Sequence, residues 1–399
     1  MDSIAGWVMA RKKLAVVLGC AIGLAHGAYD ADDTLKLNAE VGYGYDDNVF
    51  RLSEQGSNSI TRKHGQQGDS KLDVALGGRI DVPVSRQNFS ASARVNRQQY
   101  MDFSELNYTG WQADLGWAWQ AGSLLSGQLN AGTSRSMSSF EDTRDGRIDM
   151  VRQSNVQWQG AYLILSNWAL VADVGYSKQT HDVRTLEDAK NLTYGLGMRY
   201  RTEYGSSLTV RQQWQDYDYL RNLAFIPADR RGYEERLTQL VLQWPYSEKL
   251  NISATGGVSS WKSKLTGERS SSTPQGNLDL TWQATGKTKL RVGYGQNFDQ
   301  FSSGAGRDLQ RSSYLGSTWA MSEKWLWDLE LRLRDRKTET VSGALVRDEE
   351  YRSVKGSVVF KPLRNWSVRS YFQIEDRNDR RGSADYDSLQ AGLSSKYDF

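Results

Sequence analysis

Residues 35–45 read LKLNAEVGYGY, a stretch in which two kinds of side chain alternate. The Leu, Ala, Val and Tyr side chains fall on one face, whereas Lys36, Asn38 and Glu40 fall on the other. Successive side chains of a β-strand point to opposite faces, while a helix would repeat its apolar face every three or four residues. These residues therefore predict a strand with one apolar and one polar face.

The same alternation recurs to the end of the chain in segments of about ten to fourteen residues. Clear examples are the segments 72–82, 89–95, 111–119, 168–176, 192–200, 278–282, 325–333 and 366–374. Counting all segments gives about eighteen strands, and roughly sixteen if the weakly alternating segments 233–244 and 311–321 are left out. No segment shows the helical period, so the sequence predicts an all-β fold.

The connections between these segments alternate in length. Short ones fall near 83–87, 120–123, 165–167, 202–205, 245–248, 285–287, 322–324 and 362–365. Longer, more polar ones fall near 46–69, 135–150, 178–188, 218–231, 263–272, 299–308, 337–346 and 378–384, and a compact one at 102–106 lies on the same side. Short turns at one end and long loops at the other are typical of outer-membrane barrels. We therefore expect a transmembrane, antiparallel up-and-down β-barrel in the bacterial outer membrane.

The composition excludes a bundle of transmembrane helices. Hydrophobic residues make up 38% and charged residues 24% of the chain, and the mean hydropathy is −0.64. Beyond residue 27 the longest apolar runs, at 161–165 and 168–172, hold about five residues, whereas a spanning helix needs about 20. An aromatic content of 11% likewise excludes a disordered chain.

The first 27 residues resemble a secretory signal peptide. Three basic residues at 11–13 precede an apolar stretch at 14–24 and a small-residue cleavage site before Ala28. We predict that residues 1–27 are removed and that residues 28–399 form a single barrel domain. A lipoprotein signal ending at Cys20, the one cysteine of the sequence, is the alternative. Cleavage lowers the net charge from +3 to about +1, which argues against a nucleic-acid partner.

Aromatic residues gather at the predicted strand ends. Trp119, Trp168, Trp244, Trp282, Trp325 and Trp366 lie beside the short connections, and Tyr45, Tyr108, Tyr176, Trp214 and Tyr294 lie toward the long ones. Two such belts match the aromatic girdles at the two membrane interfaces. The chain ends on Phe399, with Tyr397 and Leu393 on the same face, which resembles the signal of barrel assembly. We expect outer-membrane lipid and the barrel-assembly machinery as partners.

The face opposite the apolar one is rich in charged and amide side chains. The candidate pore-lining residues on it are Arg199, Arg211, Gln213, Arg291, Arg332, Arg334 and Arg369. An eighteen-stranded barrel is too wide for side chains alone to fill, so a water-filled lumen is expected. Arg, Gln and Asn side chains hydrogen-bond hydroxyl and carboxylate groups. The simpler interpretation is that these side chains only keep the lumen hydrated. The more specific one is that they bind carbohydrate along the wall.

Catalysis and metal binding have little support. His64 and His181 fall in predicted long loops, where a histidine is ordinarily solvated, and no G-x-S-x-G motif follows the pair His181-Asp182. The oxygen side chains at 46–48 would suit Ca²⁺ but lack a closing ligand set, and Asp and Asn are ordinary turn formers. We therefore predict no enzymatic activity, no metal and no cofactor.

Residues 43–52, YGYDDNVFRL, resemble the opening signature of a family of β-barrel porins encoded with exopolysaccharide biosynthesis genes, of the exosortase-associated type. The signature residues are Tyr45, Asp46, Asp47, Asn48, Phe50 and Arg51. The resemblance implies a role in moving or assembling an exopolysaccharide at the outer membrane, with periplasmic export components as partners, and it implies no catalytic residue. Physically, residues 46–48 would end the strand ladder through side-chain hydrogen bonds, and Val49, Phe50 and Leu52 would fold back as an anchor.

The sequence thus predicts a passive conduit in exopolysaccharide export. Three alternatives stay open: a general or sugar-selective diffusion porin, a barrel enzyme acting on lipid or polysaccharide, and a structural tether that conducts nothing. Long loops are expected to restrict the outer mouth, because an open lumen of this width would leak small solutes.

Overall fold

The computed structural model describes residues 34–141, 143–220, 232–264, 270–299, 307–339, 344–381 and 385–399. The predicted signal peptide and Cys20 lie outside the described residues. Among the described residues, no helix is long and apolar enough to cross a membrane.

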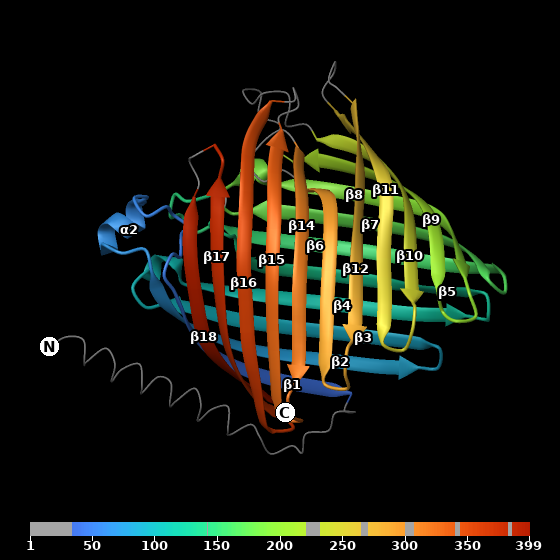
Figure 1. Ribbon diagram of the computed structural model, residues 1–399, viewed down its shortest axis with the longest axis horizontal. Coiled ribbons are helices and arrows are strands. Elements are labelled where there is room, and N and C mark those ends of the chain that lie inside the picture. The colour runs from blue at the N-terminus through green and yellow to red at the C-terminus, as the bar shows by residue number, and fades with distance from the viewer. Residues whose placement is uncertain are drawn as a thin grey trace.

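The structure is built from eighteen strands that form one sheet (Figure 1). The strands are β1 (Leu35–Asp46), β2 (Asp69–Val84), β3 (Gln87–Tyr100), β4 (Tyr108–Ala121), β5 (Leu125–Met137), β6 (Met150–Leu165), β7 (Trp168–His181), β8 (Ala189–Arg201), β9 (Ser207–Tyr219), β10 (Tyr233–Pro245), β11 (Leu250–Ser263), β12 (Ser270–Gln283), β13 (Thr288–Asp299), β14 (Arg307–Ala320), β15 (Trp325–Glu339), β16 (Leu345–Leu363), β17 (Trp366–Asp379) and β18 (Tyr386–Asp398). The helical elements of the described residues are α2 (Ser59–His64), η1 (Ser104–Leu106) and η2 (Thr185–Glu187), all in loops.

The sheet closes on itself. Each strand pairs antiparallel with the next along the chain, as β9 does with β10, and β18 pairs with β1, where Val41 lies opposite Ser395. Closure leaves no unpaired edge, which a barrel needs in a bilayer because no water is there to satisfy free backbone groups. The predicted fold and strand count are confirmed, and the two weakly alternating segments are β10 and β14.

The predicted alternation of short and long connections is also confirmed. The turn between β2 and β3 holds Ser85 and Arg86, whereas the loop between β1 and β2 runs from residue 47 to 68 and contains α2. Short turns join the strands at one end of the barrel, and the long loops lie at the other end, which we call the outer mouth.

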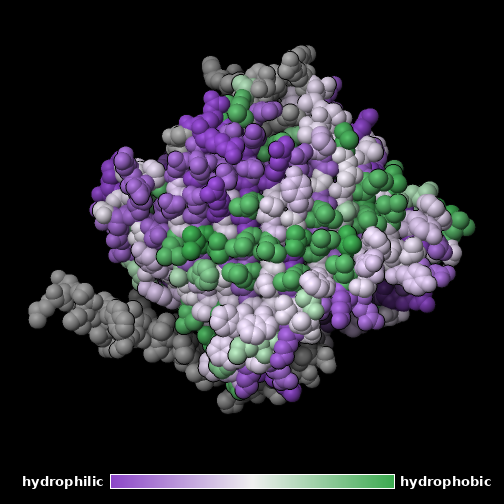
Figure 2. All heavy atoms as spheres, viewed as in Figure 1, coloured by the Kyte–Doolittle hydropathy of each residue, from purple (hydrophilic) through white to green (hydrophobic). Residues whose placement is uncertain are grey.

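The outward face of the barrel is apolar, as the alternation predicts. Leu76 and Leu196 leave 61% and 60% of their surface exposed, and Leu333 and Leu393 are also exposed. Figure 2 shows an apolar band across the near face, with polar side chains gathered above it. Such a band matches the hydrocarbon layer of a membrane. A water-soluble protein would not expose so continuous an apolar surface.

The aromatic side chains follow the predicted belts with one exception. Trp168, Trp244 and Trp282 are exposed beside the short turns, and Tyr45 is exposed toward the outer mouth. Tyr108, however, does not face lipid. Its side chain lies with those of Asn96 and Asp73 on the inner face, because Trp111 points outward and residues three apart on a strand point to opposite faces.

Candidate functional site

The predicted pore-lining residues all lie on the inner-facing positions of their strands, alternating with exposed apolar neighbours such as Leu331 and Leu333 on β15. Most are held by a partner on the same wall. Arg211 pairs with Asp173 at 2.6 Å, Arg291 with Asp328 at 3.4 Å and Arg332 with Glu330 at 2.8 Å. Arg369 donates to the Ser357 hydroxyl at 3.1 Å, whereas Arg334 reaches a loop. Arg199 lies on β8 and Gln213 on β9.

One side of the inner wall, formed by β5, β6 and β7, presents mainly amides. Gln128 donates to Gln159 at 2.9 Å, and Gln153 donates to Gln179 at 3.2 Å. Each amide still has hydrogen-bonding capacity left for water or a solute. This part of the lumen is therefore polar and largely uncharged.

An apolar cluster built from three loops lies at the outer mouth. Phe50, from the loop between β1 and β2, is fully buried. Its ring lies 5.4 Å from that of Phe103, in the loop between β3 and β4, and 4.8 Å from that of Phe140, in the loop between β5 and β6. Val49, Leu52, Ile60, Tyr100 and Leu106 complete the cluster. The predicted anchor of residues 49–52 thus ties three loops to one another.

The signature residues form the turn that sends Phe50 into this cluster. The Asn48 amide donates to the Leu52 carbonyl at 2.7 Å and its oxygen accepts from the Leu52 N–H at 2.9 Å, which closes a tight loop. Arg51 has a left-handed backbone (φ 56°) and pairs with Asp46 at 3.0 Å. Polar side chains commonly end a ladder in this way.

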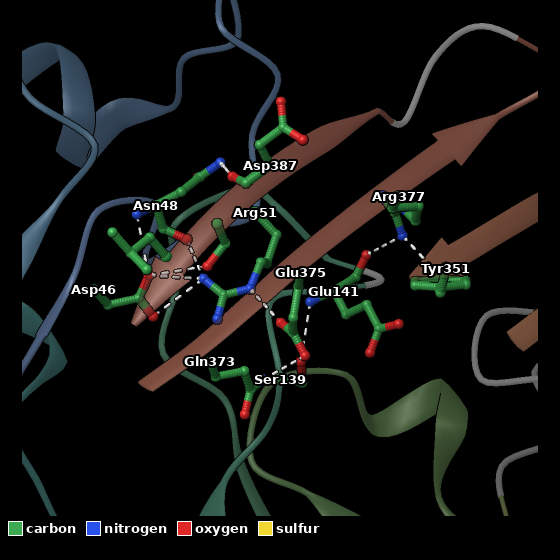
Figure 3. A network of polar contacts seen from close by, with 12 residues as sticks. Asp46, Asn48, Arg51, Ser139, Glu141, Tyr351, Gln373, Glu375, Arg377 and Asp387 are labelled. Atoms are coloured by element: carbon green, nitrogen blue, oxygen red, sulfur yellow. Dashed lines mark hydrogen bonds and ion pairs between the residues drawn. The ribbon is translucent and has the colours of Figure 1, made fainter. Parts of the chain in front are cut away.

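The same turn is tied to the strands on which the barrel closes. Asn48 also donates to the Asp387 carbonyl at 2.8 Å, and Arg51 lies 3.6 Å from Glu375 (Figure 3). The Leu389 N–H donates to Asp47 at 2.7 Å. The side-chain oxygen atoms of Asp46, Asp47 and Asn48 thus each accept from a different group within the protein. Within the described ranges, no group of three or more His, Cys, Asp or Glu side chains is placed to hold a metal.

The loop between β5 and β6, residues 138–149, crosses to the opposite wall. Its Glu141 forms an ion pair with Arg334 on β15, and the Glu141 carbonyl accepts a hydrogen bond of 2.8 Å from Arg377 on β17 (Figure 3). Strand β15 is the tenth strand after β5 in a ring of eighteen, so the two lie on nearly opposite sides of the barrel. Loop 138–149 therefore bridges the lumen near its outer mouth.

The wall that receives this loop carries a buried charged network. Arg336 lies 2.6 Å from Glu349, and both side chains are at least 90% buried. The Tyr351 hydroxyl donates to Glu349 at 2.9 Å and accepts from Arg377 at 3.1 Å. The Arg334 guanidinium lies over the Tyr351 ring at 3.8 Å. Several shared partners for each charge make the network rigid, because an unpaired buried charge would be costly.

Sequence reasoning missed this network. Arg336, Glu349, Tyr351 and Arg377 occupy inner-facing positions at the outer ends of their strands, which the alternation alone could have shown. Glu141 lies in a loop, where no period indicates the direction of a side chain.

The histidines lie in two separate places, and one prediction about them is wrong. His181 is the last residue of β7 and is buried rather than solvated, with its Nδ1 2.8 Å from Asp149 and not beside Asp182. Asp182 instead pairs with Arg135 at 2.7 Å. His64 lies 3.3 Å from Glu105. His181 contacts the carboxylates of Asp149 and Glu187 and the amide of Gln179. These contacts hold the adjoining loops in position.

A cavity of about 750 Å³ lies in the lumen below the bridging loop. It is lined by the consecutive strands β15 to β18 and β1 to β5, and its lining includes Gln112, Ser134, Lys355 and Arg369. A solute that enters the cavity therefore meets charged side chains.

The barrel is similar in fold to solved outer-membrane proteins of Pseudomonas aeruginosa. With OccK9 (OpdG) the TM-score is 0.50 at 12% identity, over 94% of this chain and 100% of that chain. With the outer membrane protein OpdK it is 0.48 at 13%, over 92% and 99% of the two chains. With the siderophore receptor PirA it is 0.43 at 11%, over 93% and 81%.

The likeness to OccK9 shows the fold alone, because the two sequences are only 12% identical. No family model matches the chain, and no curated protein matches it in sequence. This fold, together with the closed sheet and the apolar outer band, indicates which membrane the protein spans. The protein is an integral β-barrel of the bacterial outer membrane.

Proposed function

We propose that the protein is a diffusion channel for small polar solutes, narrowed at its outer mouth by loop 138–149. The observation that carries the proposal is the bridge from Glu141 to Arg334 and Arg377 across the lumen. A polar inner wall and a 750 Å³ cavity below the bridge offer small solutes a wet path. The barrel itself supplies no energy, so transport follows the concentration gradient.

Export of an exopolysaccharide is the second candidate, because residues 43–52 resemble the signature of barrels encoded with exopolysaccharide genes. The contacts of these residues hold the turn after β1 and tie it to β18. A polymer chain would also have to displace the bridging loop and break its contacts with Arg334 and Arg377. The constricted mouth therefore favours the diffusion channel.

Two experiments separate these candidates. In liposome swelling with neutral sugars of increasing size, the wild-type protein should admit monosaccharides and exclude oligosaccharides, and Glu141→Gln should admit larger sugars. In the source bacterium, deletion of the gene should leave exopolysaccharide secretion unchanged. Polymer lost from the medium and accumulated in the periplasm, with no swelling in liposomes, would overturn the diffusion channel in favour of export.

A further inference from the structure

The inner wall holds a tyrosine that lies flat along the sheet. Tyr371 on β17 pairs with Gly392 on β18, which pairs with Gly44 on β1. A methyl group added to Gly392 would lie 2.6 Å from the Tyr371 ring, and one added to Gly44 would lie 2.7 Å from its hydroxyl. Strands lie about 4.8 Å apart, so a side chain that reaches the second strand must lie along the wall.

The two glycines form a recess that the ring occupies. A side chain at Gly44 or Gly392 would push Tyr371 into the lumen. With glycine at both positions the ring rests against the backbone, and the partly exposed side chain lines the 750 Å³ cavity. An aromatic face presented in this way is a stacking surface for another ring.

Three cations surround this surface. Lys71 pairs with Gly44 and so continues the same row of the sheet beyond the tyrosine hydroxyl. Lys355 and Arg369 lie one step above and one step below the row, since Lys355 pairs with Gln373 and Arg369 with Val359. All three line the cavity. None forms an ion pair with a carboxylate among the described residues, and Arg369 donates to the Ser357 hydroxyl.

The carboxylates of the cavity are mostly committed elsewhere. Glu40 pairs with Arg94 at 2.7 Å, Asp328 with Arg291 at 3.4 Å and Glu330 with Arg332 at 2.8 Å. Asp73 accepts from the Asn96 amide at 3.4 Å. The available charge beside the Tyr371 ring is therefore net positive, which suits an anionic ligand.

We propose that this part of the cavity is a binding subsite for a carboxylate carried on a ring. The ring of the solute stacks on Tyr371, and its carboxylate contacts Lys71 or the pair Lys355 and Arg369. Both a uronic acid and an aromatic acid have this chemistry. The inference rests on the proposed function only in that diffusion brings the solute to the cavity.

The test is calorimetric binding to the full-length barrel in detergent, which does not depend on conduction. Benzoate and glucuronate are compared with acetate, which lacks the ring, and with glucose, which lacks the charge. We expect one or both ring acids to bind, and acetate and glucose to bind more weakly. Benzoate alone identifies an aromatic acid, and glucuronate alone identifies a sugar acid.

Variants then assign the two contacts. Tyr371→Leu should weaken binding about threefold to tenfold through loss of stacking, whereas Tyr371→Phe should bind like the wild type. Either Lys71→Gln or the combined replacements Lys355→Gln and Arg369→Gln should weaken binding about twofold to fivefold, as expected for a solvated ion pair, and the variant that does so identifies the cation that contacts the carboxylate. Tyr314→Leu is the matched control, because Tyr314 also lies over a glycine, Gly293, but belongs to β14 outside this cavity.

Equal binding of acetate and benzoate, or unchanged binding in Tyr371→Leu, would overturn the subsite. Each variant is first checked for a folded barrel by its shift on unheated electrophoresis gels. Binding without conductance would overturn the diffusion channel and leave the subsite standing, and conductance without binding would do the reverse.

Discussion

The carbonyl of Glu141, in the loop between β5 and β6, accepts a hydrogen bond of 2.8 Å from Arg377 on β17, a strand six places from β5 around the ring of eighteen. The Glu141 carboxylate pairs with Arg334 on the same receiving wall. Loop 138–149 is thereby held across the lumen by two arginines from two strands. The width of the outer mouth therefore depends on a few polar contacts.

Replacing Arg334 with glutamine should widen the channel. The substitution removes an ion pair worth roughly 1–3 kcal/mol, as is usual for a hydrogen bond between charged groups, and favours release of loop 138–149. The single-channel conductance in a planar bilayer is expected to rise. Arg332→Gln is the control, because Arg332 pairs with Glu330 of its own strand. Equal conductance in the wild type and Arg334→Gln would show that this contact does not hold the mouth.

Phe50→Ala should loosen the loops without unfolding the barrel. A buried phenylalanine replaced by alanine typically costs 3–5 kcal/mol, and Phe50 contacts rings from two other loops. We expect protease to cleave within residues 47–68 of the variant while the strands stay protected. The exposed Met101, replaced by alanine, is the matched control. Resistance of the Phe50 variant to protease would contradict the anchoring role.

Gly293→Ala should destabilise the barrel itself. The added methyl group would lie 2.1 Å from the ring of Tyr314, so the ring or the backbone must move, at a cost of about 1–3 kcal/mol. Gly256→Ala is the matched control, because a methyl group there meets no atom within 4 Å. Denaturant unfolding of both variants in lipid vesicles measures the difference. Equal stability of Gly293→Ala and Gly256→Ala would show that the close approach of the Tyr314 ring to Gly293 does not contribute to barrel stability.

The strands could be predicted from the sequence because their side-chain period is two and one face meets lipid. Residues 35–45 and 325–333 carry that period clearly, and the phase also indicates which residues face the lumen. Aromatic type alone predicts the wrong face for Tyr108. The phase set by Trp111 places it inside.

The bridge across the lumen could not be predicted in this way. Glu141 and Arg334 are 193 residues apart, and loop 138–149 has no period that fixes the direction of a side chain. The anchor role of Phe50 could be proposed from its apolar type beside Asn48, but its ring partners come from two other loops. Contacts between loops depend on the closed barrel that brings the loops together.

Acid should release the loop between β7 and β8, residues 182–188. Burial alone would raise the pKa of Asp149, but hydrogen bonds from His181 and Arg184 outweigh it and lower that pKa. The ionised carboxylate therefore stabilises the fold above the pKa of an unfolded aspartate, about 3.9, and this contribution is lost as the pH falls through the lower folded pKa.

The hydrogen-exchange protection of the Val183 amide reports this change, because that amide donates to Asp149 at 2.9 Å. Protection should fall below about pH 4 in the wild type. In Asp149→Asn it should be low at neutral pH and change little with acid. A wild type that keeps its Val183 protection through this range would refute the assignment.

Removal of Phe399 should impair assembly. The Phe399 N–H donates to the Leu37 carbonyl at 2.8 Å, and its ring lies 5.1 Å from that of Tyr397, at the seam where β18 meets β1. We expect less folded barrel in the outer membrane, measured by fractionation and by the heat-dependent shift on gels. Lys361→Ala, at an exposed site, is the control. Normal levels without Phe399 would leave the residue a structural contact only.

The most direct test of the diffusion channel is the single-channel current of the purified protein in a planar bilayer, compared with a variant in which residues 139–147 are replaced by a short Gly-Ser linker. The account predicts stable, small current steps for the wild type and larger steps for the variant, because the linker cannot reach Arg334 and Arg377. A wild type and a variant that both stay silent, although folded, would contradict a diffusion channel, and steps of equal size in the two would contradict a constriction by loop 138–149.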